Sequence, residues 1–145
     1  MTGRLAAARL LRFGLGFLLL ATAVGKLLDL GGFARVLGGY EALPPALLLP
    51  AGVAITALEL ALAGWLLSGW RLARAAAASA VLHGAYAVWS ALTLARGLRI
   101  ENCGCFGVFW ARPLTWVTVA EDLIVTGFSV TLARLAPTPS EARAA

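Results

Sequence analysis

Four long stretches of apolar residues alternate with shorter charged segments along this chain. Residues 75–95 contain no Asp, Glu, Lys or Arg, and the only formal charge in residues 42–70 is Glu59. A run of about 20 apolar residues can cross the hydrocarbon core of a bilayer as a helix. Proline is tolerated at a helix start and tryptophan favours the membrane interface, so Pro45 and Trp70 fit the ends of the second stretch. The pattern predicts four membrane-spanning helices, over about residues 11–29, 45–70, 75–95 and 114–135.

The first stretch also resembles a secretory signal peptide. Arg4, Arg9 and Arg12 precede an apolar run that ends in three small residues, Ala-Thr-Ala at 21–23, as a cleavable signal does. The apolar pattern continues past that point to Leu28, however, where a mature soluble protein would turn polar. We therefore expect the first stretch to be retained as a membrane span.

The overall composition is typical of a protein that has lipid as its solvent. Of the 145 residues, 61% are hydrophobic and 13% are charged, whereas soluble domains average about 25% charged residues. This excludes a disordered chain, a coiled coil and an ordinary soluble domain. We predict an all-α fold, an integral membrane four-helix bundle with short loops, as a single domain over residues 1–135. Residues 136–145 are predicted to be a disordered polar tail.

Basic residues are distributed unequally between the two sides that four spans define. Both termini then lie on one side, which receives seven basic residues against five on the other. Because basic residues favour the cytoplasmic side, both termini are predicted to be cytoplasmic, in a multi-pass protein of the cytoplasmic (inner) membrane. The net charge of +5 reflects this topology, and no nucleic-acid partner is expected. The seven are Arg4, Arg9, Arg12, Arg71, Arg74, Arg134 and Arg143, and the five are Lys26, Arg35, Arg96, Arg99 and Arg112.

The only two cysteines, Cys103 and Cys105, lie between the third and fourth spans, in a segment predicted to face outward. Gly104 and Gly107 allow the backbone to bend, so that both sulfur atoms can reach disulfide geometry. A small, strained disulfide is of the labile, catalytic kind. Nearby arginines, among them Arg112, would stabilise a reactive thiolate. Thiol–disulfide exchange is therefore the leading hypothesis for this pair.

Other roles for the cysteine pair also fit the sequence. The two thiols could pack inertly, or they could brace a loop in a non-catalytic membrane assembly factor. Two thiolates at this spacing could also bind or transport a soft metal such as Cu(I) or Hg(II). A transport path would need further soft ligands, and the spans contain no cysteine and no methionine-rich stripe. We therefore predict no dedicated metal site.

Glu59 and His83 are ionisable residues at similar depths in two neighbouring predicted spans. A charge near the centre of a bilayer is costly, so such residues are candidates for function. Inside the bundle, the carboxyl and imidazole groups could pair, relay a proton or hold the polar headgroup of a membrane quinone. The alternative is a structural polar bridge between helices.

Lys26 and Asp29 lie one turn apart near the outer end of the first span, a spacing that allows a local ion pair. Lys26 could equally reach Glu121 or Asp122 of the last span. Adjacent helical residues point about 100° apart, so only one of these two acids is expected to face the core. Structural ion pairing is the role expected of Lys26, Asp29 and Asp122.

Several short motifs follow one another in a characteristic order. They are Gly25-Lys26-Leu27-Leu28-Asp29, then Phe33-Ala34-Arg35-Val36 with Tyr40 and Leu43-Pro44, then Leu58-Glu59-Leu60 with Gly64, and finally Cys103-Gly104-Cys105-Phe106-Gly107. Over about residues 10–130, this order resembles the MauE group of DoxX-like membrane proteins. The resemblance implies a four-helix membrane protein that works with a periplasmic thioredoxin-like partner. In methylamine utilisation, this group is needed to mature a disulfide-rich dehydrogenase subunit.

One position departs from the resembled group. Its members often carry an Arg-Asp pair early in the last helix, where this chain has Glu121 and Asp122. The buried cation of that pair is therefore missing here. The match favours Asp122 as the acid that faces the core.

The residues and the resemblance together predict a membrane thiol–disulfide redox protein. Cys103 and Cys105 would exchange electrons with the periplasmic thioredoxin-like partner through a mixed disulfide. The exchange would support disulfide formation in, or maturation of, a secreted protein. Electrons could flow towards a membrane quinone or, in the opposite direction, towards the substrate protein.

Overall fold

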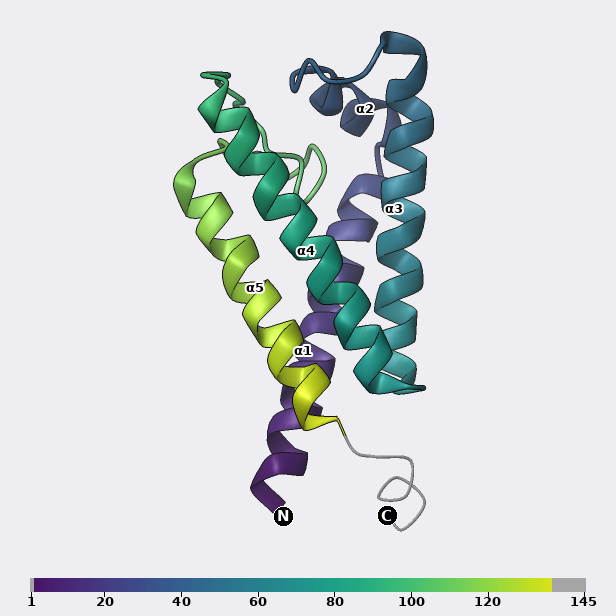
Figure 1. Cartoon of the computed structure of the whole chain (residues 1–145). Helices are drawn as coiled ribbons and strands as arrows, with labels where there is room; N and C mark the ends of the chain where they lie inside the picture. The colour runs from purple at the N-terminus through teal and green to yellow at the C-terminus, as the bar shows by residue number, and fades with distance from the viewer. Residues whose placement is uncertain (1, 137–145) are drawn as a thin grey trace.

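The described part of the chain forms five α-helices, four of which have the length and apolar composition of membrane spans (Figure 1). The structure is a computed structural model that describes residues 2–136. Apart from Ala136, the tail predicted to be disordered lies outside the described residues. Among those residues there is no strand, which confirms the all-α prediction, and the four long helices confirm the predicted number of spans. The helices are α1 (Thr2–Leu27), α2 (Leu30–Gly38), α3 (Pro45–Ser68), α4 (Leu72–Ala95) and α5 (Trp116–Leu135).

The helices differ from the predicted ones at two places. α1 begins at Thr2 rather than near residue 11, and the short helix α2 is an addition to the predicted elements. Asp29 caps α2, because its side chain accepts a hydrogen bond from the backbone N–H of Gly32 at 2.6 Å. The predicted ion pair between Asp29 and Lys26 is wrong. The chain leaves α1 before it reaches Asp29, so the two residues do not keep the spacing of a continuous helix.

The four long helices pack as two pairs, α1 with α3 and α4 with α5 (Figure 1). Far less contact joins α3 to α4, and these two helices diverge towards the end of the bundle where α2 lies. At the opposite end, near both ends of the described chain, buried apolar side chains close the bundle. They include Leu15, Leu19, Leu66, Ala75 and Leu132. The bundle is therefore sealed at one end and open at the other.

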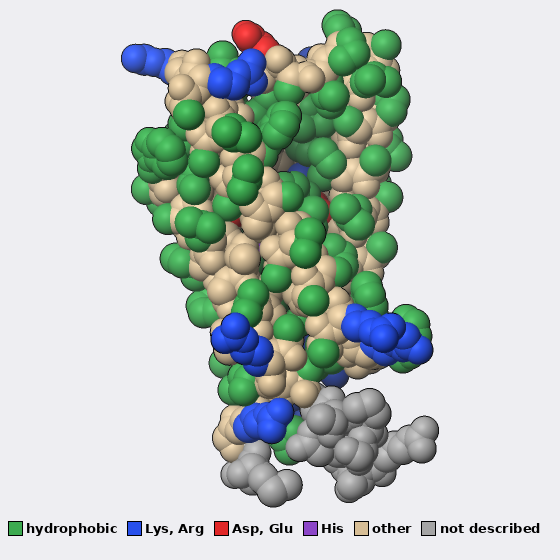
Figure 2. Space-filling view, viewed as in Figure 1, with side chains coloured by type: hydrophobic (Ala, Val, Ile, Leu, Met, Phe, Trp, Pro, Cys, Tyr) green, Lys and Arg blue, Asp and Glu red, His purple; other side chains and the backbone are tan. Residues whose placement is uncertain are grey.

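The outer surface of the bundle is apolar between two charged ends. Figure 2 shows Lys and Arg side chains near both ends of one face, with mostly hydrophobic and uncharged groups between them. Large side chains such as Leu10, Val81 and Leu123 are exposed along the helices. Extensive exposed apolar surface marks a site of membrane contact. The fold therefore places the outer faces of the long helices against lipid.

The backbone of α1 touches the segment that joins α4 to α5 at Gly25, where an added Cβ would lie 2.5 Å from the Phe106 carbonyl oxygen. Gly64 is also helical, but an added Cβ there would meet nothing within 4 Å. We predict that Gly25→Ala lowers the free energy of unfolding by about 1–3 kcal/mol, the usual cost of overpacking. Gly64→Ala should leave it unchanged or raise it by up to about 1 kcal/mol, because alanine favours helices.

Denaturant titration of both variants in detergent micelles measures this difference. Equal free energies of unfolding for the two alanine variants would contradict the close contact at Gly25.

Candidate functional site

The segment between α4 and α5, residues 96–115, folds back over the open end of the bundle. Within it, the backbone N–H of Cys103 donates to the carbonyl oxygen of Arg112 at 2.7 Å and closes the loop. Gly104 and Gly107 have φ values of +76° and +71°. Glycine adopts this left-handed conformation without steric cost. The two glycines therefore bend the loop as the sequence predicts, and we call residues 96–115 the cysteine loop.

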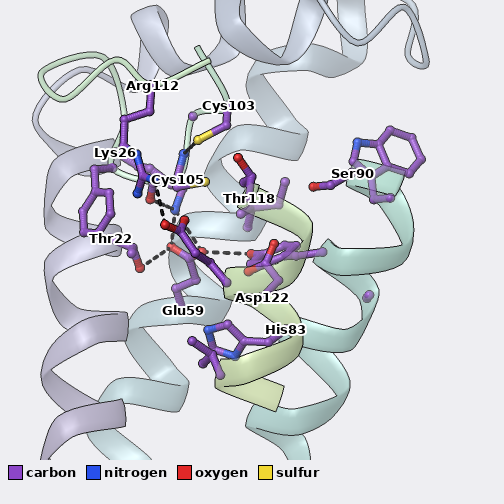
Figure 3. A pocket seen from close by; sticks show the side chains of 18 of the residues that line it. Thr22, Lys26, Glu59, His83, Ser90, Cys103, Cys105, Arg112, Thr118 and Asp122 are labelled. Atoms are coloured by element: carbon purple, nitrogen blue, oxygen red, sulfur yellow. Dashed lines mark hydrogen bonds and ion pairs between the residues drawn. The ribbon is translucent and has the colours of Figure 1, made fainter. Parts of the chain in front are cut away.

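Both cysteines are free thiols and partly buried. The backbone N–H of Cys105 points at the sulfur atom of Cys103, 3.4 Å away (Figure 3). The hydrogen bond donated by the Cys105 thiol is the main cause that lowers the pKa of Cys103 to about 6, and the charge of Arg112 adds to it. The same hydrogen bond, together with burial, raises the pKa of Cys105. At neutral pH, Cys103 is therefore a thiolate and Cys105 a thiol.

Side chains from two other elements hold the carbonyl oxygens of both cysteines. Tyr40, which follows α2, donates its hydroxyl to the carbonyl oxygen of Cys103 at 2.8 Å. Lys26, near the end of α1, donates to the carbonyl oxygen of Cys105 at 2.8 Å. Burial raises the pKa of Tyr40, so its hydroxyl keeps its proton and remains a donor. The two thiols are thus positioned by segments far from the cysteine loop in the sequence.

Beneath the cysteine loop lies a buried ion pair between α1 and α3. The Nζ atom of Lys26 lies 2.9 Å from Oε1 and 2.7 Å from Oε2 of Glu59. Lys26 is 4% exposed and Glu59 is 1% exposed. The hydroxyl of Tyr86 in α4 donates to Oε1 at 2.9 Å, and that of Thr22 in α1 lies 3.3 Å from Oε2. Glu59 therefore faces the bundle interior and joins three helices (Figure 3).

Sequence reasoning missed Thr22 and Tyr86 as partners of Glu59, although signals for both exist. Thr22 precedes Lys26 by four residues, so the two share one face of α1. Tyr86 places a hydroxyl within a membrane span, where it needs a hydrogen-bond partner. Both residues therefore belong to the polar network around Glu59.

His83 does not pair with Glu59, and that prediction is wrong. The Nδ1 atom of His83 lies 2.9 Å from the carbonyl oxygen of Ser79, four residues earlier in α4. This bond assigns the ring proton to Nδ1, since a carbonyl oxygen only accepts. The imidazole finds its partner within its own helix. Glu59 is bonded instead to the ammonium group of Lys26.

The two adjacent acids of α5 meet different surroundings. Glu121 accepts a hydrogen bond from the guanidinium of Arg112 at 2.7 Å, in a partly exposed ion pair. A cation from the cysteine loop therefore stands beside Glu121. Asp122 lines the cavity described next and forms no ion pair within residues 2–136. The structural ion pair expected for Asp122 is thus not formed by the described chain.

A cavity of about 510 Å³ lies between the two helix pairs, under the cysteine loop. Its lining is mainly apolar and includes the rings of Phe33 and Trp89. Figure 3 shows the two cysteines at one end of this cavity and His83 at the other, with Glu59 between them. A mostly apolar cavity with a few convergent polar groups is typical of a small-molecule site. From residue 2 to residue 136, no three His, Cys, Asp or Glu side chains gather as metal ligands.

Comparisons with known proteins agree on one family. Residues 4–136 match the family described as Methylamine utilisation protein MauE. A curated relative, the Methylamine utilization protein MauE of Paracoccus denitrificans, is 28% identical over 123 residues, which are 85% of this chain. The match covers 66% of that relative, so the chain spans slightly less than two thirds of its length. No solved structure matches the chain.

The protonation state of Cys103 predicts how its reactivity depends on pH. Alkylation requires the thiolate, so the rate should fall as pH drops through a midpoint of about 6, well below the ordinary value of 9.0. Cys105→Ala removes the thiol donor and should move the midpoint upwards. Cys105→Ser keeps an O–H donor and should keep the midpoint low. Iodoacetamide labelling of Cys103, followed by mass spectrometry, measures the midpoints.

A midpoint near 9 for Cys103 in the unaltered protein would contradict the assigned thiolate. So would equal midpoints in the Ser and Ala variants of Cys105.

The buried ion pair predicts strong coupling between its two members. Glu59→Leu or Lys26→Met alone leaves a buried charge unpaired and should lower the free energy of unfolding by about 3–5 kcal/mol. The double variant removes both charges and should cost less than the sum of the two single changes. As a control, Glu121→Gln breaks the partly exposed pair with Arg112 and should cost only about 0–1 kcal/mol.

Denaturant titration in detergent micelles measures all four variants. If the losses in the free energy of unfolding from the substitutions at Lys26 and Glu59 simply add in the double variant, the two residues do not stabilise the protein as a pair.

Proposed function

This chain belongs to the MauE family, and from that membership we propose that it is a membrane thiol–disulfide exchange protein of methylamine utilisation. Cys103 and Cys105 are its reactive pair. Its partner is a periplasmic thioredoxin-like protein with a Cys-x-x-Cys motif. The exchange supports disulfide formation in a secreted protein that the partner helps to mature.

The observation that carries this proposal is the contact between the two cysteines, in which the backbone N–H of Cys105 is directed at the sulfur of Cys103 at 3.4 Å, together with the lowered pKa of Cys103. A thiolate is both the attacking form of cysteine and the form that leaves most readily. Stabilising the thiolate also stabilises the reduced pair relative to its disulfide. The disulfide form is therefore an oxidant, and electrons flow from the partner to the cysteine pair.

The exchange passes through a mixed disulfide. A thiolate of the reduced partner attacks the sulfur of Cys103 in the Cys103–Cys105 disulfide, the S–S bond breaks, and Cys105 leaves and takes up a proton. The partner's second thiolate then attacks the partner sulfur of the mixed disulfide and releases Cys103 as a thiolate. The partner has lost two electrons and gained a disulfide. The Cys103–Cys105 pair has gained two electrons, and Cys105 holds one proton.

The distribution of charge supports an outward-facing cysteine loop. Within residues 2–136, the sealed end of the bundle carries basic residues and no Asp or Glu, whereas the cysteine-loop end carries both signs. Basic residues favour the cytoplasmic side, so we place the termini in the cytoplasm of a cell with an inner membrane. The basic residues at the sealed end are Arg4, Arg9, Arg12, Arg71, Arg74 and Arg134.

Single cysteine variants test the proposed exchange. The probe is a thioredoxin-like domain that keeps only its attacking cysteine, activated as a mixed disulfide with thionitrobenzoate. Cys105→Ser keeps a thiolate at Cys103 and has no thiol to resolve the product, so it should form a stable disulfide-linked complex. Cys103→Ser leaves the protonated Cys105 and should react at least about tenfold more slowly at neutral pH.

Release of the coloured thionitrobenzoate gives the rate, and a non-reducing gel shows the complex. The double variant Cys103→Ser, Cys105→Ser is the control. It should neither release thionitrobenzoate nor form the complex. If the double variant still supports full maturation of the secreted substrate in cells, the protein is an assembly factor and the exchange proposal is wrong.

A further inference from the structure

An apolar groove runs along the outside of the bundle between α3 and α4. It has a volume of about 650 Å³ and is lined by side chains such as Leu58 and Leu62 of α3 and Val81 of α4. Ala85 of α4 lines both this groove and the cavity under the cysteine loop, so the two spaces adjoin. Figure 2 shows a hollow between α3 and α4, with charged atoms visible inside it. A molecule dissolved in the bilayer therefore has an apolar route to the cavity.

Two polar groups in the cavity have unused hydrogen-bonding capacity. The carboxyl group of Asp122 has no side-chain hydrogen bond or ion pair with the described residues. The Nδ1 atom of His83 is bonded to Ser79, which leaves Nε2 as an acceptor without a partner in the described chain. Both side chains line the cavity. A flat ring with two hydroxyl groups, as in a quinol, could donate a hydrogen bond to each of these groups.

The proposed exchange itself requires an electron acceptor, because each cycle leaves the cysteine pair reduced. The acceptor must take two electrons and must reach Cys103 and Cys105 at the loop end of the cavity. The groove favours a molecule with a long apolar tail that is soluble in lipid. The flat aromatic walls at Phe33 and Trp89 favour a planar ring.

We propose that the cavity binds a membrane quinone, with its ring under the cysteine loop and its isoprenoid tail in the groove between α3 and α4. This inference rests on the thiol–disulfide exchange proposed above and names the oxidant that regenerates the disulfide. The ring lies between the cysteines and His83, and Asp122 faces it from α5. The tail leaves past Ala85 towards the lipid.

The reoxidation step balances with one further proton. Cys103 thiolate and Cys105 thiol lose two electrons and form one S–S bond. The quinone gains those two electrons and two protons and becomes a quinol. One proton comes from the Cys105 thiol, and the second reaches the ring through Asp122 or His83, two ionisable groups that line the cavity.

Quinone reduction by the reduced full-length protein in detergent tests the proposal. The probe is a ubiquinone analogue with a ten-carbon tail, compared with a ubiquinone analogue that lacks the tail. The loss of quinone absorbance should match the loss of two thiols per protein, and the tailed quinone should react faster. Ala78→Phe narrows the groove and should slow the tailed quinone about tenfold, because about two methylene groups lose their burial.

Val88→Phe is the matched control, since Val88 is exposed on the same helix and lines neither space. It should react with both quinones like the unaltered protein. Equal effects of the two Phe substitutions, or equal rates for the two quinones with the unaltered protein, would overturn the position of the tail.

A binding measurement separates this proposal from the exchange on which it rests. The double variant Cys103→Ser, Cys105→Ser cannot exchange disulfides, but it should still bind the tailed quinone. The bound quinone should quench the fluorescence of Trp89. Trp89→Phe in that background should remove most of the quenching. If the protein exchanges with the thioredoxin-like probe but neither binds nor reduces the quinone, the quinone site alone is wrong. Quinone binding without exchange would instead overturn the proposed function.

Discussion

The buried ammonium group of Lys26 joins α1 to α3 and to the cysteine loop. An ammonium group has three N–H donors, and here two contact the carboxylate of Glu59 and one contacts the carbonyl oxygen of Cys105. A charge in a low-dielectric interior is costly unless it is paired and its donors are all used. This requirement fixes α1 against α3 and holds the cysteine loop above the pair. The positions of the thiols are therefore set by a charge inside the membrane region.

The open end of the bundle follows from how the helices pair. α1 packs with α3 and α4 packs with α5, while the sealed end is filled by apolar side chains. Towards the other end, the interior holds the buried pair of Lys26 and Glu59, and the helix pairs separate around the mainly apolar cavity. The cysteine loop and α2 cover that end. The same arrangement thus gives the bundle a closed half and a half that carries the cysteines. We propose that the closed half faces the cytoplasm.

Much of the fold could be predicted from the sequence, because long uncharged runs and helix-end residues determine it locally. α2 was not predictable in this way, since it is short and contains two adjacent glycines, Gly31 and Gly32, which are poor helix formers. The spacing of a continuous helix pairs the cap of α2, Asp29, with Lys26, but α1 ends at Leu27.

The residues of the candidate site can be named from the sequence, but their contacts can be predicted only in part. The sequence identifies the cysteine pair and Glu59 as candidates for function, and it assigns Lys26 to an ion pair. Depth along a helix, however, does not say which way a side chain points. His83 therefore seemed able to reach Glu59, although a carbonyl one turn away already satisfies it. Pairing between helices depends on their rotation, which periodicity alone does not give.

If Cys103 and Cys105 form one redox unit, a thiol titration shows a single transition for both. The purified full-length protein is equilibrated in redox buffers of reduced and oxidised glutathione, and the free thiols at each position are counted by mass spectrometry. Both thiols should disappear together as a single two-electron couple, with a tenfold change in their ratio per about 30 mV. Independent oxidation of the two cysteines, or two thiols that stay free throughout, would contradict the account.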